Sequence, residues 1–572
     1  MLQILIILAA FIAVIFPMGK YLYHVAVGEH TFADPVFDRV DSGIYRLCGI
    51  DRKEMSWKQY AAAMLATNAV MALAGYLILR VQELLFLNPN AIGAMKPSLA
   101  FNTVISFITN TNLQHYSGES GLTYLSQMAV IIFLMFASAA TGFSVAIAAV
   151  RGFAGRAKTM GNFYADLIRV TTRVLLPLSL FVGVVLVSQG VVQTLSPNIT
   201  VSTIEGKYQD IAMGPMAALE SIKHIGTNGG GFLGANSAAP FENPNVLTNM
   251  IEILSMMLLP GACAVMFGLM VRSRTKKIGN DKEKKVLFGS EAKPIFAVML
   301  ILLAVGIAVC FGAEQAGNPL LEQAGLNQSM GSMEGKEVRF GIAQSALFST
   351  VTTAFTTGSV NNMHDTLTPL GSMVPLMNMM LNLVFGGKGV GLLNMLLYVV
   401  LTVFICGLMV GRTPEYLAKK IEGKEMKLVA LGIILHPLLI LSFSALAVAV
   451  PAGLNGITNP GYHGLTQILY EYTSAAANNG SGFEGLADNT YFWNITTALV
   501  MFLGRYLSII ISLAIAGSLM LKNPVSESIG TLRTDTRTFA ISLLLIVLII
   551  AALTFFPALV LGPIAEHMTL WN

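Results

Sequence analysis

Long apolar runs dominate the pattern of hydrophobic and polar positions along the 572-residue chain. A helix needs roughly 20 predominantly apolar residues to cross the hydrocarbon core of a membrane. Ten runs have that length, and we predict a transmembrane helix over each: 2–23, 60–82, 123–150, 174–194, 250–271, 294–313, 374–411, 428–451, 492–521 and 538–562. The pattern therefore predicts an all-α membrane protein with about ten transmembrane helices.

The seventh run, 374–411, is too long for one crossing and contains the sequence GGKGVG at 386–391. Glycine weakens a helix because its backbone has more freedom to lose. Non-helical backbone at membrane depth is tolerated only where protein buries it or where it lines an ion path. We therefore predict that this helix is broken at the glycines.

Positive charges are confined to alternate connections between the runs. Five segments hold 27 of the 35 Lys and Arg residues: 20–58, 151–173, 272–293, 412–427 and 522–537. The positive-inside rule assigns these segments to the cytoplasm and both termini to the outer side, as an even number of crossings requires. The first run has Lys20 behind it and no positive charge in front, which indicates a retained helix and not a cleaved signal peptide.

Four further stretches on the predicted outer side are too apolar for exposed loops and too short or too broken to cross the membrane. Each ends in small polar residues, and together they cover 98–112, 214–231, 341–360 and 463–482. Their polar ends begin 118, 129 and 122 residues apart, at Thr109, Thr227, Thr356 and Asn478. A spacing this regular indicates one unit used four times. We predict four pseudo-repeats of helix, re-entrant pore loop and helix around a central pore.

Each half-helix would end near the membrane centre, where the partial negative charge of its C-terminus favours a cation. Four polar loops around one axis offer a ring of oxygens that can replace the hydration shell of K⁺. None of the four polar ends contains Asp or Glu, and neutral oxygens suit a monovalent cation better than Ca²⁺ or Mg²⁺. The alternative is close helix packing through small residues. Four copies at similar spacing favour the pore.

Composition excludes several other functions. With 54% hydrophobic and 12% charged residues and a net charge of only +4, the chain has no basic face for nucleic acid. The four cysteines show no CxxC or Cys/His spacing, so we expect neither a disulfide framework nor zinc. The sequence also contains no GxxxxGK[ST] loop and no DKTG motif. We therefore expect that this chain does not hydrolyse ATP.

Several longer motifs carry a family resemblance. They are TNTN (109–112), TNGGGF (227–232), NSAAPFENP (236–244), VFGGKGVGLLNMLL (384–397), GLMVGRTPEYLAKKIEGKEMKL (407–428) and AANNGSGFEGL (476–486). Over essentially its whole length the chain resembles the potassium-binding A subunits of Kdp potassium-importing P-type ATPases, which are distantly similar to Trk/Ktr transporters. The resemblance implies K⁺ as the transported ion and the bacterial plasma membrane as the location. It implies three partner chains, a catalytic ATPase subunit and two small accessory subunits, besides membrane lipid.

Carried onto this sequence, the resemblance implies a set of K⁺-filter residues. They are Thr109, Asn110, Thr111, Asn112, Gln114, Thr227, Asn228, Gly229, Gly230, Asn236, Thr356, Thr357, Gly358, Asn478, Asn479, Gly480 and Ser481. The chain departs from the family pattern at four places: Ala239 stands where His is expected, Thr357 where some members have Cys, Asn382 where Glu is common and Lys388 where a small apolar residue is common.

Three cations lie outside the loops at predicted membrane depth: Lys223, Lys388 and Arg505. A charge there costs several kcal/mol unless it is paired. For Lys223, a local ion pair with Glu220 is the favoured interpretation. Lys388 and Arg505 are candidates for gating or for blocking a straight path to the cytoplasm, with a structural partner as the equal alternative.

Two acidic residues near the polar ends have open or structural interpretations. Glu471 either attracts cations or packs against a polar neighbour. We expect the pair His364 and Asp365 to make structural hydrogen bonds rather than a metal site.

Three functions remain in competition. The chain is the ion-conducting subunit of a P-type pump, an autonomous gradient-driven transporter or channel of the Trk/Ktr kind, or a membrane scaffold. A neighbouring chain with DKTG would favour the first and a soluble nucleotide-binding regulator the second. The repeats divide the chain into 1–59 (first helix and cytoplasmic loop), 60–155, 156–280, 281–425 and 426–525 (pore repeats 1 to 4) and 526–572 (last helix).

Overall fold

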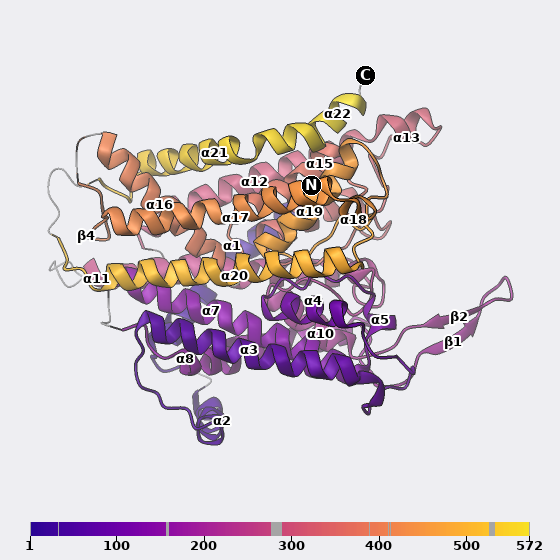
Figure 1. Ribbon diagram of the computed structural model, residues 1–572, viewed down its shortest axis with the longest axis horizontal. Coiled ribbons are helices and arrows are strands. Elements are labelled where there is room, and N and C mark those ends of the chain that lie inside the picture. Colours follow the sequence, from indigo (N-terminus) through magenta and orange to yellow (C-terminus); the bar gives the residue numbers. More distant parts are fainter. Residues whose placement is uncertain are drawn as a thin grey trace.

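The computed structural model describes residues 2–31, 34–155, 159–275, 289–387, 389–409, 411, 413–525 and 532–570. Within these residues, ten helical segments are long and apolar enough to cross a membrane, and they run side by side along the horizontal axis of Figure 1. Their limits are Leu2–Val27, Trp57–Leu84, Tyr124–Ala154, Phe163–Ser188, Val246–Val271, Ala292–Gln323, Val390–Met409, Gly423–Ala449, Tyr491–Met520 and Arg537–Leu570. The prediction of an all-α multi-pass membrane protein is confirmed.

Half of these segments are formed by one helix each: α1 (Leu2–Val27), α11 (Val246–Thr275), α16 (Val390–Met409), α17 (Gly423–Ala449) and α20 (Tyr491–Met520). The others join shorter pieces: α3 (Trp57–Val81) with η1 (Gln82–Leu84); α6 (Tyr124–Ser126), η2 (Gln127–Ile132) and α7 (Phe133–Ala154); α8 (Phe163–Val170), η3 (Thr171–Leu175) and α9 (Leu176–Ser188); α12 (Ala292–Ala316) with α13 (Pro319–Gln323); and α21 (Arg537–Leu559), η5 (Val560–Ile564) and α22 (Ala565–Leu570).

The seventh predicted helix is two helices, α15 (Pro369–Leu381) and α16, joined by non-helical backbone. The break begins before the glycines, because Asn382 takes a left-handed conformation (φ 47°) and ends α15. Gly386 then approaches Gly391 so closely that a Cβ on either would overlap the other residue. The break was predicted at 386–391, and the non-helical backbone includes the first three glycines of that sequence but begins earlier, at Asn382.

Four short buried helices correspond to the predicted half-helices: α4 (Pro97–Ile108), α10 (Met216–Ile225), α14 (Gly341–Ala354) and α19 (Tyr462–Ala477). Proline occupies the first position of α4 and precedes α10, where its missing N–H costs nothing. Each short helix packs against the helices before and after it in its repeat: α4 against α3 and α7, α10 against α9 and α11, α14 against α12 and α15, and α19 against α17 and α20. The four pseudo-repeats are therefore confirmed, whereas the residue limits assigned to them stay a prediction.

The four half-helices end in the same way. A residue with positive φ follows each: Asn110, Thr227, Thr356 and Asn478, at 60°, 48°, 48° and 55°. The next N–H donates to the carbonyl five positions back: Thr111 to Ser106, Asn228 to Lys223, Thr357 to Thr352 and Asn479 to Ser474, over 2.7–2.9 Å. This common geometry aligns the repeats residue by residue. In this alignment Asn110 corresponds to Thr227, Thr356 and Asn478, one residue after Thr109, where the polar end was predicted to start.

The remaining elements lie at the ends of the bundle. Strands β1 (Ile199–Ser202) and β2 (Tyr208–Ile211) form an antiparallel hairpin that projects at the right of Figure 1, where α5 (Gly118–Gly121) and α18 (Pro451–Leu454) also lie. A second pair, β3 (Glu415–Tyr416) and β4 (Lys419–Lys420), lies at the opposite end. The short helix η4 (Asn236–Ala238) follows the second polar loop.

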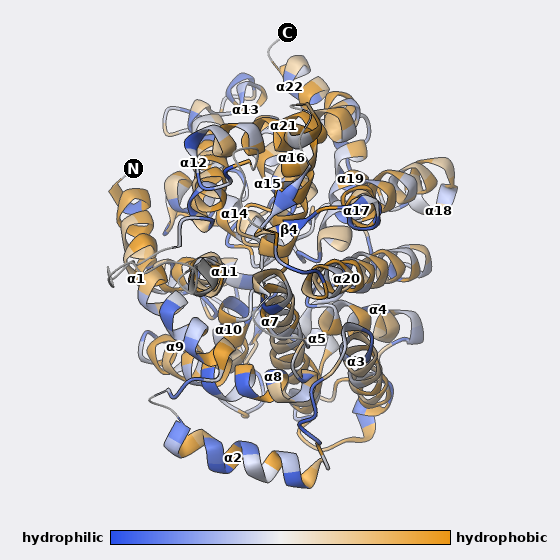
Figure 2. Cartoon of the chain, turned by 90° about the vertical axis from the view of Figure 1, so that its left-hand side faces the viewer, coloured by the Kyte–Doolittle hydropathy of each residue, from blue (hydrophilic) through white to orange (hydrophobic). Residues whose placement is uncertain are grey.

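Helix α2 (Asp34–Leu47) lies apart from the bundle, and Figure 2 shows it banded in hydrophilic and hydrophobic colours, while orange predominates on the helices around the rim. Arg173 holds α2 against the bundle through ion pairs with Asp34, Asp38 and Asp41. Burial opposes ionisation of the Asp34 carboxyl, but hydrogen bonds from Thr31 and Arg173 outweigh it and lower its pKa. This anchor lies at the end where the basic connections gather.

Candidate ion-binding site

The polar loops that follow the four half-helices meet at one place inside the bundle. A Cβ atom on Gly229 would lie 2.7 Å from Thr111 O and 3.0 Å from Asn479 O, so loops from repeats 1, 2 and 4 touch here. A Cβ on Gly358 of repeat 3 would overlap Asn479 O, and one on Gly480 would overlap Thr111 O. Only glycine fits at these positions. The predicted filter residues of all four repeats are thus brought together.

Hydrogen bonds join each repeat to the next and close a ring. In order they are Asn110 Nδ2 to Thr227 O (2.9 Å), His224 Nε2 with Ser359 Oγ (3.0 Å), Asn479 Nδ2 to Thr352 O (3.0 Å) and Asn478 Nδ2 to Thr111 Oγ1 (3.0 Å). Side chains therefore hold the loops from behind. The backbone carbonyls of Thr111 and Asn479 lie where the loops face one another.

Several polar atoms of this ring are buried and have no hydrogen-bond partner among the described residues. They are both amide atoms of Asn112, Asn228 Oδ1 and Thr357 Oγ1. An unpaired buried polar group costs about 1–3 kcal/mol, so each needs an explanation. A desolvated cation bound by the loops would supply the missing partner for the oxygens.

Other predicted filter residues brace the loops instead of lining them. Gln114 makes a reciprocal pair with Gly231, donating from Nε2 to the carbonyl at 3.0 Å and accepting from the N–H at 2.9 Å. Ser481 donates to Asn479 Oδ1 at 2.6 Å. Thr109 pairs its hydroxyl with that of Thr111 at 2.8 Å.

The third loop position breaks the fourfold symmetry. Asn112 has φ 60° where repeats 2, 3 and 4 have Gly229, Gly358 and Gly480. Asn tolerates left-handed backbone better than most residues. The ring is thus pseudo-fourfold, and only its first repeat adds a side-chain amide at this level.

Lys223 occupies a position, four residues before the first left-handed residue of the loop, at which the other three repeats have a serine or threonine. There Ser106, Thr352 and Ser474 use their hydroxyls to hold the adjacent loop, for example Ser474 Oγ accepting from Gly480 N at 3.0 Å. The Lys223 ammonium, fully buried, lies 2.6 Å from Glu220 Oε2. The predicted ion pair is confirmed.

The Lys223 ammonium makes further contacts within repeat 2. It donates to Asn236 Oδ1 at 2.7 Å and to Ser237 Oγ at 3.1 Å, and it lies 3.5 Å from Glu242 Oε2. Asn236, predicted as a filter residue, is therefore a partner of this buried lysine. We name Lys223, Glu220 and Glu242 the repeat-2 charge cluster.

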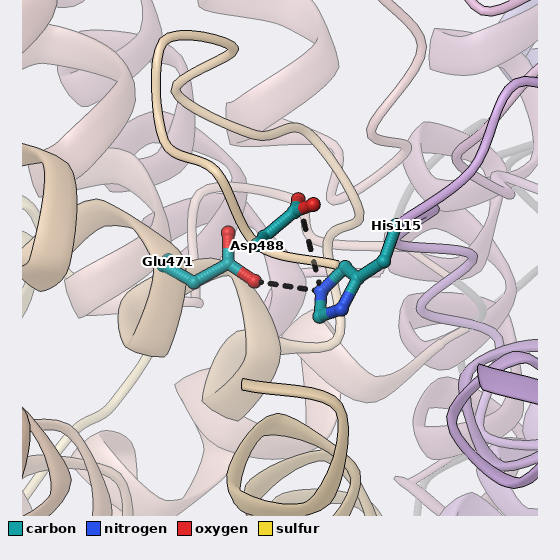
Figure 3. Close-up of side chains that lie close together, drawn as sticks. All are labelled: His115, Glu471 and Asp488. Carbon is teal, nitrogen blue, oxygen red and sulfur yellow. Dashed lines mark hydrogen bonds and ion pairs between the residues drawn. The ribbon is translucent and has the colours of Figure 1, made fainter. Parts of the chain in front are cut away.

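A second charge cluster joins repeat 4 to repeat 1 (Figure 3). His115 Nε2 lies 3.1 Å from Glu471 Oε1 and 3.8 Å from Asp488 Oδ2. His115 comes from the loop after α4, Glu471 from α19, and Asp488 from the loop that precedes α20. Burial disfavours protonation of His115, yet the two carboxylates raise its pKa to about 9. The cluster thus holds a positive charge between two negative ones, and Glu471 packs against a polar neighbour.

The two clusters are built on the same plan. Glu220 and Glu471 both stand seven residues before the first left-handed residue of their loops, Thr227 and Asn478. Each has a second carboxylate from the chain beyond the loop, Glu242 or Asp488, and a cation between the two. Repeats 1 and 3 have hydroxyl residues, Thr103 and Ser349, at this position.

Beneath repeats 2 and 3, the break between α15 and α16 lies against the filter loops. A Cβ on Gly387 would lie 2.7 Å from Thr227 Oγ1 and 2.8 Å from Thr356 O. Asn382 fixes the segment by accepting from Thr356 Oγ1 at 3.2 Å and donating to Ala477 O at 3.3 Å. Lys388 lies outside the described residues, so its predicted role is not examined by the structure.

Arg505 of α20, the other predicted gating residue, is buried behind repeat 1. Its Nη2 reaches Ser138 O at 3.5 Å, and the Ser138 hydroxyl donates to Asn110 Oδ1 at 3.0 Å. A short chain of contacts thus links this cation to the first filter loop. The gating role stays a prediction.

His364 and Asp365 hold repeat 3 to repeat 4. His364 Nδ1 lies 2.8 Å from Tyr470 Oη, and Asp365 Oδ1 accepts from Gln467 Nε2 at 2.9 Å and lies 3.1 Å from His463 Nε2. Burial disfavours protonation of His463, but Asp365 and Glu566 raise its pKa to about 9. The expected structural role is confirmed, with partners from another repeat.

Sequence reasoning missed the cations and carboxylates that complete the charge clusters, namely His115, Asp488 and Glu242. One signal was available, because the equal offsets of Glu220 and Glu471 from their loops can be read directly. No signal in the sequence predicted the pairing of His115 with Glu471, because the two residues are 356 positions apart.

Comparison with known proteins places this geometry in a family. The family described as potassium-transporting ATPase A subunit matches residues 5–568. A protein of Clostridium acetobutylicum named "Potassium-transporting ATPase potassium-binding subunit" is 58% identical over 570 residues and covers 100% of both chains. A protein of the same name from Geobacillus kaustophilus is 54% identical, covering 99% of each chain.

A solved structure shares the fold. The potassium transporter TrkH from Vibrio parahaemolyticus superposes with a TM-score of 0.53 at 14% sequence identity, covering 86% of this chain and 96% of that one. At this identity the likeness shows the architecture alone. The family match over nearly the whole length and the identity of 58% leave one conclusion: this chain belongs to the family of the potassium-transporting ATPase A subunit.

Proposed function

We propose that this chain is the K⁺-binding and K⁺-selective translocating subunit of an ATP-driven potassium import complex. It takes up external K⁺ through a filter of four loops and passes the ion toward a separate P-type ATPase subunit. The observation that carries the proposal is the closed ring of loops, in which backbone carbonyls lie where the loops meet and buried amide and hydroxyl oxygens have no partner among the described residues. The resident ion of the filter is its cargo, K⁺.

The chemistry of the ring favours a monovalent cation. Its members are Thr, Asn, Gly, Gln and Ser, and no carboxylate occurs among the predicted filter residues. Neutral oxygens replace the loosely held water of K⁺ at lower cost than that of a divalent ion. The half-helices add the partial negative charge of four C-termini pointing at the ring. Side-chain bonds from behind fix the loops, which supports discrimination by size and coordination.

The path below the filter does not run straight to the cytoplasm in this proposal. The segment from Asn382 to Gly387 lies against the second and third loops, and Lys388 and Arg505 add positive charges that repel K⁺. The ion therefore turns sideways toward the catalytic subunit. Gating by these two cations is part of the proposal.

The complex has four kinds of chain in this proposal. The two relatives named above are potassium-binding subunits of an ATPase, and we infer a catalytic P-type subunit and two small accessory subunits as partners, in the lipid of a bacterial plasma membrane. The termini face the outer side and the basic connections the cytoplasm. The Trk-like architecture keeps the autonomous transporter as the second candidate.

A substitution pair in one loop tests the filter. Gly480→Ala places a methyl group on Thr111 O at a residue with φ 107°, whereas Gly482→Ala meets nothing within 4 Å. We expect Gly480→Ala to abolish high-affinity K⁺ uptake or its preference over Na⁺, and Gly482→Ala to behave as wild type. The measurement is ⁸⁶Rb⁺ or K⁺ uptake by cells that depend on this complex, with purified complex compared for yield and thermal unfolding.

Two outcomes would contradict the proposal. Unchanged affinity and selectivity in folded Gly480→Ala protein would remove the filter assignment. Full concentrative uptake by this chain without its ATPase partner would favour the autonomous transporter instead.

A further inference from the structure

The cluster of His115, Glu471 and Asp488 has the geometry of a metal site. Its three candidate ligand atoms lie within 4.8 Å of one another, and His115 Nε2 is 3.1 Å from one carboxylate oxygen and 3.8 Å from the other. Ligands bound at 2.0–2.2 Å to a tetrahedral ion lie about 3.4 Å apart. The measured separations bracket that value, and Figure 3 shows both carboxylates directed at the same ring nitrogen.

The other nitrogen of His115 is already oriented for metal binding. Nδ1 lies 2.8 Å from Asn494 Oδ1, and the Asn494 amide nitrogen donates to Asn489 Oδ1 at 3.3 Å, which fixes the oxygen toward the imidazole. Nδ1 therefore donates its hydrogen to Asn494 Oδ1, and a metal ion binds Nε2 by displacing the proton of that nitrogen to solvent. Metal-binding histidines typically have such an outer partner for their second nitrogen.

Two carboxylates that face one ring nitrogen require a cation between them. In the repeat-2 charge cluster the Lys223 ammonium, tethered to α10, fills that place permanently. In repeat 4 the equivalent position is Ser474, and among the described residues the ion pairs of Glu471 and Asp488 are with His115 and not with a lysine. An ion from solution can therefore take the place between the two carboxylates that the Lys223 ammonium takes in repeat 2.

The site is accessible from the outer end of the bundle. The side chains of His115 and Glu471 are at most 1% exposed, but that of Asp488 is 26% exposed. Asp488 thus connects the buried ligands with solvent. One imidazole and two carboxylates form a donor set that suits Zn²⁺ and its neighbours better than K⁺.

We propose that His115, Glu471 and Asp488 bind a divalent transition-metal ion of the Zn²⁺ type and thereby clamp repeat 1 to repeat 4 beside the filter. His115 directly follows Gln114, which braces Gly231 of repeat 2. Metal bound here holds the first loop from behind, and on the proposed function it slows K⁺ uptake. Binding itself does not depend on that function.

Metal binding is measured directly with Co²⁺ as a coloured probe. Purified complex that contains this chain is titrated with CoCl₂, and the visible d–d absorption of low-symmetry Co²⁺ is followed before and after Zn²⁺ is added. We expect Co²⁺ to bind at one site, and we expect Zn²⁺ to displace Co²⁺ from it. His115→Gln and Asp488→Asn each weaken binding at least tenfold, and Asp488→Asn keeps the His115–Glu471 pair, so it tests the site if His115→Gln fails to fold.

His463→Gln is the matched control. His463 also lies between two carboxylates, but each takes a different nitrogen: Nδ1 faces Glu566 at 2.9 Å and Nε2 faces Asp365 at 3.1 Å. No nitrogen is shared, so this variant should bind Co²⁺ as wild type does. If wild-type complex binds Co²⁺ no more tightly than Asp488→Asn, or if His463→Gln removes the signal, the proposal is wrong. Metal binding without any effect on K⁺ uptake upholds the site and overturns only the proposed slowing of uptake.

Discussion

At the residue scale, asparagine starts two of the filter loops in left-handed backbone and threonine starts the other two, with different conformational strain. Asn110 and Asn478 begin their loops in left-handed backbone and each also bonds the neighbouring repeat. Thr227 and Thr356 hold the same backbone, although a β-branched residue rarely adopts it. Such strain costs of order 1–3 kcal/mol and persists where surroundings fix it. Repeats 2 and 3 therefore keep a strained start that repeats 1 and 4 avoid.

Loss of the Lys223 ammonium should destabilise the fold. Lys223→Met removes the partner of Glu220 and Glu242 and leaves two buried carboxylates near each other. Breaking a buried pair in this way typically costs about 3–5 kcal/mol. We expect a clearly lower midpoint of thermal unfolding in detergent, and a partial recovery when Glu220→Gln is added.

The control for this prediction is Lys207→Met in the exposed turn between β1 and β2. It removes the same charge without uncovering a buried partner, so its unfolding midpoint should match wild type. A Lys223→Met protein as stable as the control would show that the buried charges are balanced in another way.

The candidate site was predictable from sequence only as far as local patterns reach. Clustered Thr, Asn and Gly predicted the four polar loops. The spacing of three residues between Glu220 and Lys223 predicted their ion pair. Composition places the start of the first polar end at Thr109, but it cannot show that this threonine caps α4 and that Asn110 is the residue equivalent to Thr227, Thr356 and Asn478. His115 and Asp488 could not be paired, since only the fold brings the two repeats together.

At the element scale, the break between α15 and α16 differs from the other three repeats, whose second long helix is continuous. Asn382 sustains it through two side-chain hydrogen bonds, and its carbonyl also accepts from Asn394 Nδ2 at 2.8 Å. A residue in left-handed backbone ends α15 there. The chain then passes beneath two filter loops before α16 begins.

Asn382→Ala should loosen this segment. The variant loses both side-chain hydrogen bonds, and it places an alanine, which has no polar side chain to stabilise left-handed backbone, at φ 47°. Together the two effects cost about 1–3 kcal/mol of stability. On the proposed function, we expect ATP-independent ⁸⁶Rb⁺ flux into vesicles to rise above the wild-type background. Asn455→Ala, at an exposed position after α18, should leave that flux unchanged. Equal flux in the two variants would argue against an obstructing role for the segment.

The helices themselves were predicted well because apolar length is a strong signal, while their ends were less certain. The fourth crossing begins at Phe163 and not at 174, because Asn162 caps the helix and Arg173 is held within it by α2. The β1–β2 hairpin was not predicted, since four-residue strands leave little periodicity. The positions of Lys and Arg predicted the loops correctly, but they could not show that the fourth crossing continues through Arg173.

At the scale of the whole molecule, the two ends of the bundle differ in charge, and this difference makes orientation testable. The native Cys48 is exposed between α2 and α3, on the predicted cytoplasmic side. Glu205→Cys would place a thiol in the turn of the projecting hairpin at the opposite end. We expect a membrane-impermeant maleimide to label Glu205→Cys in intact cells.

Cys48 should react only after the cells are made permeable. Cys263 and Cys310 are buried and provide an internal background that stays unlabelled in either condition. Labelling of Cys48 in intact cells would reverse the predicted orientation.

The four repeats are joined in one polypeptide, and this has a genetic consequence. In a homotetramer built from one repeat, every codon change would appear four times around the axis, so a lysine beside the filter would bring four buried ammonium groups at once. Here a mutation alters one quadrant only. Lys223, His115 and Asn382 could therefore each arise in one repeat alone. Each of these departures from fourfold symmetry can mutate without changing the other three repeats.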